Sequence, residues 1–333
     1  MAIDFKAQPG HVSSFIKQHG ITCVGWDLDG TLANTEHLHR TICQVALREI
    51  SGSVISNKEF GAPHYRSAFG LPAAETSVRL AMGLRDTDPQ GFDRALRHAR
   101  SQGLSGEPTE AVGQAISLLR NEIFSFYIGN VQTEYRGSKG GILSLTLQCP
   151  SEMNEPHLIA RRDALDKVDV HTYPYVLEAL RVFEKYGLKQ GVCTSSGQGF
   201  AGPLLAAFGI NSHFATVVTA DCVPEGCHKP SPHPWHLLRA RLAGMEYSGD
   251  TTEPISDMMF IENSSGGGFS AIRAGSGPTI IIADNIPATI AKMQEKIKRF
   301  QAEFSDMRLP GRATFIPDLG ALVSQSRQRT DRE

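Results

Sequence analysis

Two carboxylates stand two positions apart directly after an apolar stretch of the sequence. The stretch at residues 21–26 leads into Asp27-Leu28-Asp29-Gly30-Thr31. The first carboxylate of such a pair can attack a phosphorus atom and bind a divalent cation, and the second can donate a proton to the leaving oxygen. Gly30 permits the backbone to turn, and Thr31 can close the loop with a hydrogen bond. The same pattern also occurs in calcium loops, but an EF-hand would need a glutamate where Leu38 stands.

Three further groups of polar residues follow in the order that a phosphoryl-transfer site would need. Thr194 and Ser195 end a second apolar stretch, where hydroxyl and backbone N–H groups can hold phosphoryl oxygens. Lys229 stands before a proline on a stiff loop and can neutralise both a nucleophile and a phosphate. Glu262 and Asn263 end a third apolar stretch and would complete a shell of oxygens for Mg²⁺. Each group alone also has a structural explanation: a helix N-cap, a surface charge, or a strand-to-helix turn.

The elements that must position these residues alternate between strand and helix. Apolar runs typical of buried parallel strands occur at residues 21–26, 188–193, 258–261 and 279–283. Apolar residues at helical spacing occur at residues 176–183, 204–208 and 237–242. This alternation predicts a doubly wound α/β domain with a parallel, Rossmann-like sheet, whose ligands bind at the carboxyl ends of the strands. The acids and hydroxyls described above stand at those ends.

The region from residue 37 to residue 168 has a different pattern. Glycines, prolines and charges interrupt its helical stretches, which lie at residues 73–82, 92–100 and 111–127. Alternating leucines at residues 143–147 predict one short strand. We therefore predict an α/β core domain formed by residues 1–36 and 169–333, with a mainly α-helical domain, residues 37–168, inserted into it. Residues 286–304 are expected to form a charged amphipathic helix.

Composition and charge narrow the class of protein. The chain has 333 residues, 41% of them hydrophobic and 20% charged, so it can bury a core and is not disordered as a whole. Its 33 basic and 35 acidic residues leave a formal charge of −2, which gives no overall attraction to nucleic acid or to an anionic membrane. No apolar run approaches the roughly 18 residues of a membrane span. The N-terminus lacks the apolar run of a signal peptide, and six scattered cysteines without C-x-x-C spacing favour a cytoplasmic location.

Taken together, the motifs resemble those of the haloacid dehalogenase superfamily, and most closely its phosphatase and β-phosphoglucomutase-like branch. The matching motifs are D-x-D-G-T at 27–31, T-S at 194–195, K-P-x-P at 229–232 and E-N-S-x-x-G at 262–267. The segment from Asn34 to His39 looks like the hinge and first cap helix of that branch. This set of motifs is specific for the superfamily and unspecific for the substrate.

The resemblance implies a Mg²⁺-dependent phosphomonoester hydrolase that acts on a small phosphorylated metabolite such as a sugar phosphate. Asp27 would attack the phosphoryl group and become an aspartyl phosphate, while Asp29 would act first as acid and then as base. The implied metal ligands are Asp27, Asp29, Glu262 and Asn263, and the implied phosphate-binding residues are Gly30, His39, Thr194, Ser195 and Lys229. The inserted domain would be a mobile cap that closes over the site. The protein would be a monomer or a homodimer.

Two observations leave alternatives open. Asn263 stands where the family usually has an acid, which predicts weaker metal binding and would also suit a catalytically weak binding or regulatory protein. A sugar-phosphate mutase has a similar core, but it carries a cap arginine near the place of Ala73, so the sequence favours hydrolysis. A separate group of soft ligands, whose spacing matches no standard zinc site, comprises Cys222, Cys227, His228, His233 and His236.

Overall fold

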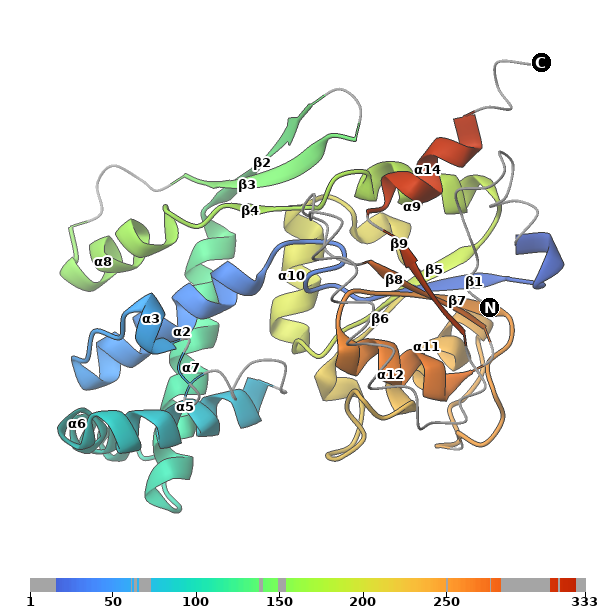
Figure 1. Cartoon of the computed structure of the whole chain (residues 1–333). Helices are drawn as coiled ribbons and strands as arrows, with labels where there is room; N and C mark the ends of the chain where they lie inside the picture. Colours follow the sequence, from blue (N-terminus) through green and yellow to red (C-terminus); the bar gives the residue numbers. More distant parts are fainter. Residues whose placement is uncertain are drawn as a thin grey trace.

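The computed structural model describes residues 16–60, 62, 65, 73–137, 140–148, 154–249, 251–275, 277–282, 312–316 and 318–327. Figure 1 shows an α/β core and a helical region beside it, joined where the chain crosses between them. The helix expected at residues 286–304 lies outside the described residues. In the part of the chain that is described, no helix combines the length and the apolar character that a membrane crossing requires.

The described part of the core contains a six-stranded sheet in which every pair of neighbouring strands is parallel. Its strands are β1 (Cys23–Trp26), β5 (Lys189–Cys193), β6 (Thr216–Val218), β7 (Met258–Glu262), β8 (Pro278–Ile282) and β9 (Arg312–Ile316). They lie in the order β6-β5-β1-β7-β8-β9, which is the Rossmann order, with the switch of direction beside β1. The prediction of a doubly wound parallel sheet is confirmed. The strands β6 and β9 were not predicted, because neither stands out as a long apolar run.

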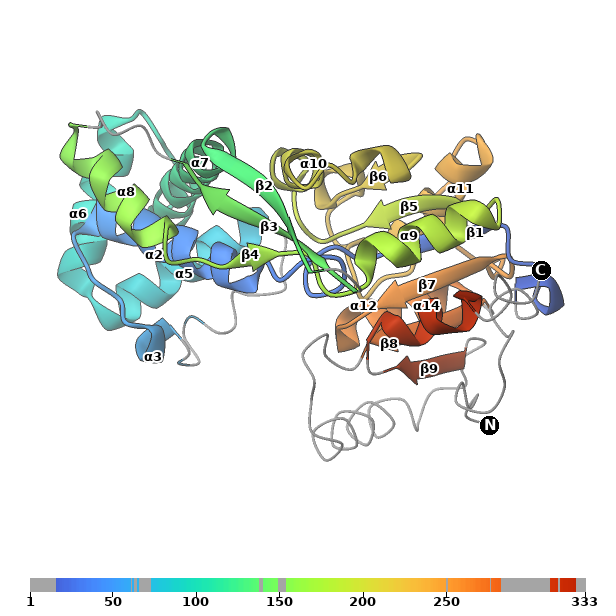
Figure 2. The same ribbon diagram turned by 90° about the horizontal axis from the view of Figure 1, so that it is seen from above.

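Helices cover both faces of this sheet (Figure 1). One face is covered by α9 (Val176–Lys185) and α14 (Gly320–Arg327), and the other by α11 (His233–Ala243) and α12 (Ser265–Ala274). The helix α10 (Gln198–Ala207) contacts the inserted region, as Figure 2 also shows. The helices expected at 176–183, 204–208 and 237–242 are therefore confirmed, with α10 and α11 beginning several residues earlier than expected.

The strand β1 is buried on both faces, since neighbouring residues of a strand point to opposite sides. Trp26 packs against Phe183 of α9, with ring centroids 5.7 Å apart. On the other face Gly25 leaves room for Trp235 of α11, because a Cβ on Gly25 would lie 2.7 Å from a carbon of that ring. Close packing on both sides holds β1 in place, and with it the acidic loop that follows.

The inserted region is mainly helical. Its helices are α2 (Glu36–Ser51), α3 (Asn57–Phe60), α5 (Ala73–Thr87), α6 (Pro89–Ser101), α7 (Pro108–Gly129) and α8 (Pro156–Leu165). A small antiparallel sheet joins β2 (Val131–Arg136), β3 (Ile142–Leu147) and β4 (Val170–His171). The three predicted helices correspond to α5, α6 and α7, and the predicted strand is β3. The sequence analysis did not find α8 or β2.

The chain leaves the core and returns to it at adjacent positions. Ala33 and Thr172 form an antiparallel bridge. The backbone N–H of Asn34 donates to the carbonyl of His171 at 3.0 Å, and that of Tyr173 donates to Leu32 at 3.0 Å. These two crossings lie beside the end of β1, so the inserted region is attached next to the acidic loop.

Candidate active site

Asp27 and Lys229 form a buried ion pair at the carboxyl end of β1. Lys229 Nζ donates to Asp27 Oδ1 at 2.9 Å, and to the carbonyl of Cys193 at the end of β5 at 2.8 Å. The ammonium group also lies 4.7 Å from the centre of the Trp235 ring, within the range of a cation–π interaction. The side chains of Lys229 and Asp27 are only 6% and 10% exposed. Two strand ends and a loop thus converge on one pair of charges, as the motifs predicted.

The surrounding charges alter the protonation of this pair. Burial raises the pKa of Asp27, and the negative charge of Glu262 raises it further. Burial alone would disfavour the ammonium form of Lys229, but the charges of Asp27 and Glu262 raise its pKa above the ordinary value. Lys229 therefore remains a cation inside the site, next to more than one carboxylate.

Glu262 is wholly buried behind Lys229. Its Oε1 accepts from Lys229 Nζ at 2.5 Å, while Oε2 accepts from the backbone N–H of Asn263 at 3.2 Å and the hydroxyl of Ser264 at 3.3 Å. Gly267 of α12 allows this packing, because a Cβ there would lie 1.9 Å from Oε1. Both carboxylate oxygens are engaged by the protein. This geometry favours a role in holding Lys229 over the direct metal ligation expected from the motif.

Asp29 accepts four hydrogen bonds from side chains. Thr35 Oγ1 lies 2.5 Å and His39 Nε2 3.2 Å from its Oδ1. Its Oδ2 accepts from Thr194 Oγ1 at 3.0 Å and from Ser196 Oγ at 2.7 Å. Burial on its own would raise the pKa of Asp29, but the hydrogen bonds from His39, Thr35 and Ser196 hold it well below the ordinary value. Asp29 is therefore ionised in this arrangement.

The loop after β5 supplies two of these donors. Thr194 and Ser196 both reach Asp29, and the backbone N–H of Ser196 donates to Thr194 Oγ1 at 3.0 Å. Ser195 is half-buried between them. The N-cap of α10 is Gly197, with no side-chain cap, so the explanation of Ser195 or Ser196 as an N-cap is wrong.

Gly30 and Asn263 pack against each other. Gly30 has a φ of +87°, a left-handed conformation that favours glycine. A Cβ on Gly30 would also lie 1.9 Å from Asn263 Nδ2. The turn that the sequence assigned to Gly30 is confirmed, and its reason is twofold: backbone conformation and the close approach of the β7 loop.

The oxygens around this turn fit Mg²⁺. Thr31 Oγ1 lies 3.1 Å from Asp27 Oδ2 and 3.3 Å from Asn263 Oδ1. These two side-chain oxygens therefore lie on either side of one hydroxyl group. Among the described residues, no three His, Cys, Asp or Glu side chains form a metal-binding group. The set expected here instead combines the Asp27 carboxylate, the Asn263 amide oxygen and the backbone carbonyl of Asp29. Oxygen donors of this kind suit a hard cation. The site holds three carboxylates, those of Asp27, Asp29 and Glu262, against the cation of Lys229, and this negative balance favours the binding of a further cation.

The separate group of cysteines and histidines does not form a zinc site. Within the described residues, no metal-binding group is found there or elsewhere. Two of its members have other partners: His233 Nδ1 lies 2.5 Å from the hydroxyl of Tyr247, and Cys222 contacts Thr219 and Arg241.

Two residues of the site were not predicted. The hydroxyls of Thr35 and Ser196 both donate to Asp29. The only signal for Thr35 was its place in the hinge-like segment. Ser196 could not be distinguished from Ser195 in the sequence, since both follow the strand and only side-chain direction separates them.

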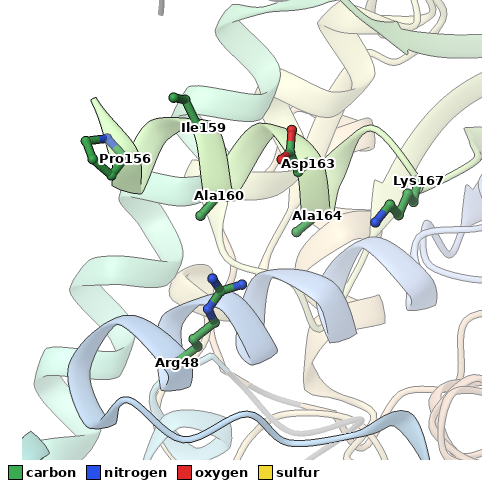
Figure 3. A pocket seen from close by; sticks show the side chains of 7 residues that line it. All are labelled: Arg48, Pro156, Ile159, Ala160, Asp163, Ala164 and Lys167. Carbon is green, nitrogen blue, oxygen red and sulfur yellow. The ribbon is translucent and has the colours of Figure 1, made fainter. Parts of the chain in front are cut away.

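A shallow cavity lies elsewhere in the inserted region. It has a volume of about 300 Å³, and Figure 3 shows the residues that line it: Arg48, Pro156, Ile159, Ala160, Asp163, Ala164 and Lys167. Arg48 is nine residues after His39 on the same helix, which corresponds to about 14 Å along the axis. This cavity between α2 and α8 is therefore distinct from the cluster around Asp27.

The model of one protein family matches most of the chain. Residues 21–275, which include every residue of the cluster around Asp27, match the haloacid dehalogenase-like hydrolases. The chain belongs to this family. The resemblance drawn from the four motifs is thereby confirmed, and so is the class of enzyme as a hydrolase.

Comparison with individual proteins adds two findings about this hydrolase. It is 37% identical over 172 residues to the phosphoglycolate phosphatase of Nitrosococcus oceani. That match covers 51% of this chain and 55% of the relative, so the chain spans about half the length of the curated relative it matches. Among solved structures, a predicted phosphoglycolate phosphatase from Haemophilus somnus has a TM-score of 0.52 at 17% identity, with 92% of this chain and 98% of that chain covered. This second likeness is one of fold.

Proposed function

We propose that this hydrolase is a Mg²⁺-dependent phosphatase that acts on a small phosphorylated metabolite through an aspartyl phosphate on Asp27. The observation that carries the proposal is the position of Asp27. It is held by Lys229 at 2.9 Å and stands two positions before Asp29, which has hydroxyl partners on both oxygens. A buried nucleophile, a fixed cation and a second carboxylate are what a two-step phosphoryl transfer needs.

In the first step, an oxygen of Asp27 attacks the phosphorus in line, and the bond from phosphorus to the leaving oxygen breaks. Asp29, after it has taken up a proton, gives that proton to the leaving oxygen. In the second step, water attacks the aspartyl phosphate, Asp29 accepts a proton from it, and Asp27 is released together with inorganic phosphate. The low pKa of Asp29 means that it is ionised in the free site, so it has to take up a proton from solvent before it can act as the acid of the first step.

The transferring oxygens need positive charge and donors around them. Lys229 supplies a cation, while Thr194, the backbone N–H of Ser195 and the turn at Gly30 supply the remaining contacts. Mg²⁺, when held by Asp27, the backbone carbonyl of Asp29 and Asn263, adds positive charge beside the phosphoryl group. Glu262 keeps the Lys229 ammonium directed toward Asp27.

We infer that residues 37–168 form a cap over this site, with its boundaries at the two crossings beside β1. Its first helix places His39, whose Nε2 lies 3.2 Å from Asp29. His39 is therefore in position to contact a substrate phosphate when the cap is closed. A relative named as a phosphoglycolate phosphatase makes short phosphorylated acids the first substrates to test, followed by sugar phosphates. We place the protein in a reducing compartment such as the cytoplasm, because the described cysteines are all free.

The test is phosphate release from a panel of phosphorylated acids, sugars and polyols, with and without Mg²⁺. Wild type should release phosphate only with Mg²⁺, and Asp27→Asn should lose activity by about a thousandfold or more, because it removes the nucleophile. Asp257→Asn is the matched control, since this carboxylate pairs with Arg239 before β7 begins. Turnover that survives Asp27→Asn would reject the covalent mechanism. Interconversion of hexose phosphates without release would favour a mutase.

A further inference from the structure

An aromatic stack connects the cap to the core beside Asp29. The ring of Phe200, in the first turn of α10, lies parallel to the imidazole of His39, with centroids 4.0 Å apart and planes inclined by 24°. Phe124 of α7 packs on Phe200 as well, with a centroid distance of 4.2 Å. Phe200 is thus the core residue between two aromatic side chains of the cap. Figures 1 and 2 both show α10 beside α7.

The stack acts on the imidazole of His39, one ring nitrogen of which faces Asp29. His39 Nε2 lies 3.2 Å from Asp29 Oδ1, and the side chain is 22% exposed. An imidazole can turn about its bond to the Cβ, and such a rotation would move Nε2 away from the carboxylate. A parallel ring at 4.0 Å opposes this rotation, because the flat faces must separate before the imidazole can turn.

The two cap residues in the stack come from helices that pack on each other. His39 lies in the first turn of α2 and Phe124 near the end of α7, and these helices are in contact. A movement of the proposed cap away from the core would therefore separate both residues from Phe200 together. The orientation of His39 is therefore coupled to the docking of the cap.

We propose that Phe200 is a positioning residue that orients His39 toward Asp29 when the cap is docked. This inference rests on the proposed function, because its consequence for turnover requires Asp29 to act as the acid and base. Phe200 contacts neither Asp27 nor Asp29 in the proposed mechanism, and it acts only through His39. Removal of its ring should therefore lower kcat, because the reacting groups lose their alignment, and any rise in KM should not exceed that of His39→Ala, since Phe200 acts only through His39.

The first experiment is a double-mutant cycle in the full chain, with phosphate release as the readout. Phe200→Leu should lower kcat by about tenfold to a hundredfold, and Phe200→Tyr, which keeps the flat ring, should restore most of it. In a His39→Ala background, Phe200→Leu should have no further effect on kcat, since both changes remove the same interaction. Additive losses would show that Phe200 acts through packing alone and would overturn the proposal.

A matched control comes from a second stack in the cap. Phe60 lies over Tyr65 with centroids 5.3 Å apart, and Phe60 is buried. Phe60→Leu should lower stability at least as much as Phe200→Leu, because Phe60 is the more deeply buried ring, and should leave kcat within about twofold of wild type. An equal loss of kcat in both variants would mean that loosening of the cap, rather than orientation of His39, explains the effect.

The second experiment does not depend on activity. In wild-type protein with labelled histidine, the ring protons of His39 should be shifted upfield by the Phe200 ring above them, and Phe200→Leu should remove that shift. Absence of the upfield shift in wild type would overturn the proposal even if turnover were normal. A wild type that shows the shift and releases no phosphate from any substrate would refute the proposed function and leave the positioning of His39 standing.

Discussion

Asn263 supplies a neutral oxygen at a position where an acid would supply charge. Its Oδ1 already accepts a hydrogen bond from Thr31 at 3.3 Å, and its Nδ2 faces Gly30. An aspartate has the same shape, so the substitution changes charge with little change in packing. At the scale of the single residue, an acid in place of Asn263 is therefore a direct test of the proposed Mg²⁺ site.

We expect Asn263→Asp to lower the Mg²⁺ concentration for half-maximal phosphate release by about tenfold, which corresponds to about 1.4 kcal/mol of added attraction. The measurement is a Mg²⁺ titration of activity, supported by calorimetric titration of Mg²⁺ alone. An unchanged half-saturation would mean that residue 263 does not contact the ion.

Gly30 offers a second test at this scale. Two features require a glycine there, the positive φ and the close approach of Asn263, and Gly20 shares only the first of them. Gly20 also has a positive φ, +60°, but a Cβ there would meet nothing within 4 Å. Gly20→Ala should therefore cost only about 1–2 kcal/mol of unfolding free energy for the left-handed backbone, with activity unchanged. Gly30→Ala should cost more and should lower kcat by about a hundredfold, since Asn263 must move.

Urea unfolding and steady-state kinetics of the two variants provide the comparison. Equal stability losses and equal activities would show that the contact between Gly30 and Asn263 has no role in shaping the site.

At the scale of the elements, a buried arginine joins three helices of the inserted region. Arg161 of α8 donates from Nε and Nη2 to Glu49 of α2 at 2.7 and 2.8 Å, and from Nη1 to Glu122 of α7 at 2.7 Å. Its side chain is only 4% exposed. The sequence analysis did not detect α8, whose only buried residues are Arg161 and Leu165, and this ion pair explains how such a helix is held in place.

Arg161→Met should lower the unfolding free energy by about 2–3 kcal/mol, because it leaves the partly buried carboxylate of Glu49 without its partner. The adjacent Arg162 is the control: it pairs with Asp163 at the surface, and Arg162→Met should change stability by at most about 0.5 kcal/mol. Urea denaturation measures both. Similar values for the two variants would contradict a structural role for the buried cluster.

At the scale of the whole molecule, the chain passes between the core and the inserted region at one narrow connection, and α10 adds contacts to α7 and β2. The Asn34 side chain holds its two crossings together: Oδ1 accepts from the backbone N–H of His171 at 2.8 Å, and Nδ2 donates to the carbonyl of Asp169 at 3.1 Å. The connection lies beside the acidic loop, so a change in its geometry alters how the cap meets the site.

Asn34→Ala should lower the unfolding free energy by about 1–3 kcal/mol, since two backbone groups of the return crossing, the N–H of His171 and the carbonyl of Asp169, lose their partner. Amide hydrogen exchange should become faster at residues 33–35 and 170–173 in particular. Asn130→Ala is the control, because its Nδ2 donates to Phe126 within the inserted region, and it should leave exchange at the crossings unchanged. Unchanged exchange in Asn34→Ala would show that the crossings are held by other contacts.

The sequence by itself determined the class of fold and the family of hydrolase. Apolar runs that end in Asp27, Thr194 and Glu262 predicted a parallel sheet, and parallel strands necessarily bring their carboxyl ends to one edge. The turn at Gly30 was also predicted, because a turn directly after a strand depends on neighbouring residues in the chain. These inferences depend on residues close together in the chain, where the type and spacing of residues carry the information.

Only the tertiary structure decided which atoms meet. Glu262 accepts a hydrogen bond from Lys229, and Ser196 donates to Asp29 in addition to Thr194. Phe200 stacks on His39. The segments that carry these residues are separated by many tens of positions, and a shared sheet edge leaves their side-chain rotamers and approach distances open. Packing of the surrounding helices selects one arrangement from these, and packing is a property of the whole chain.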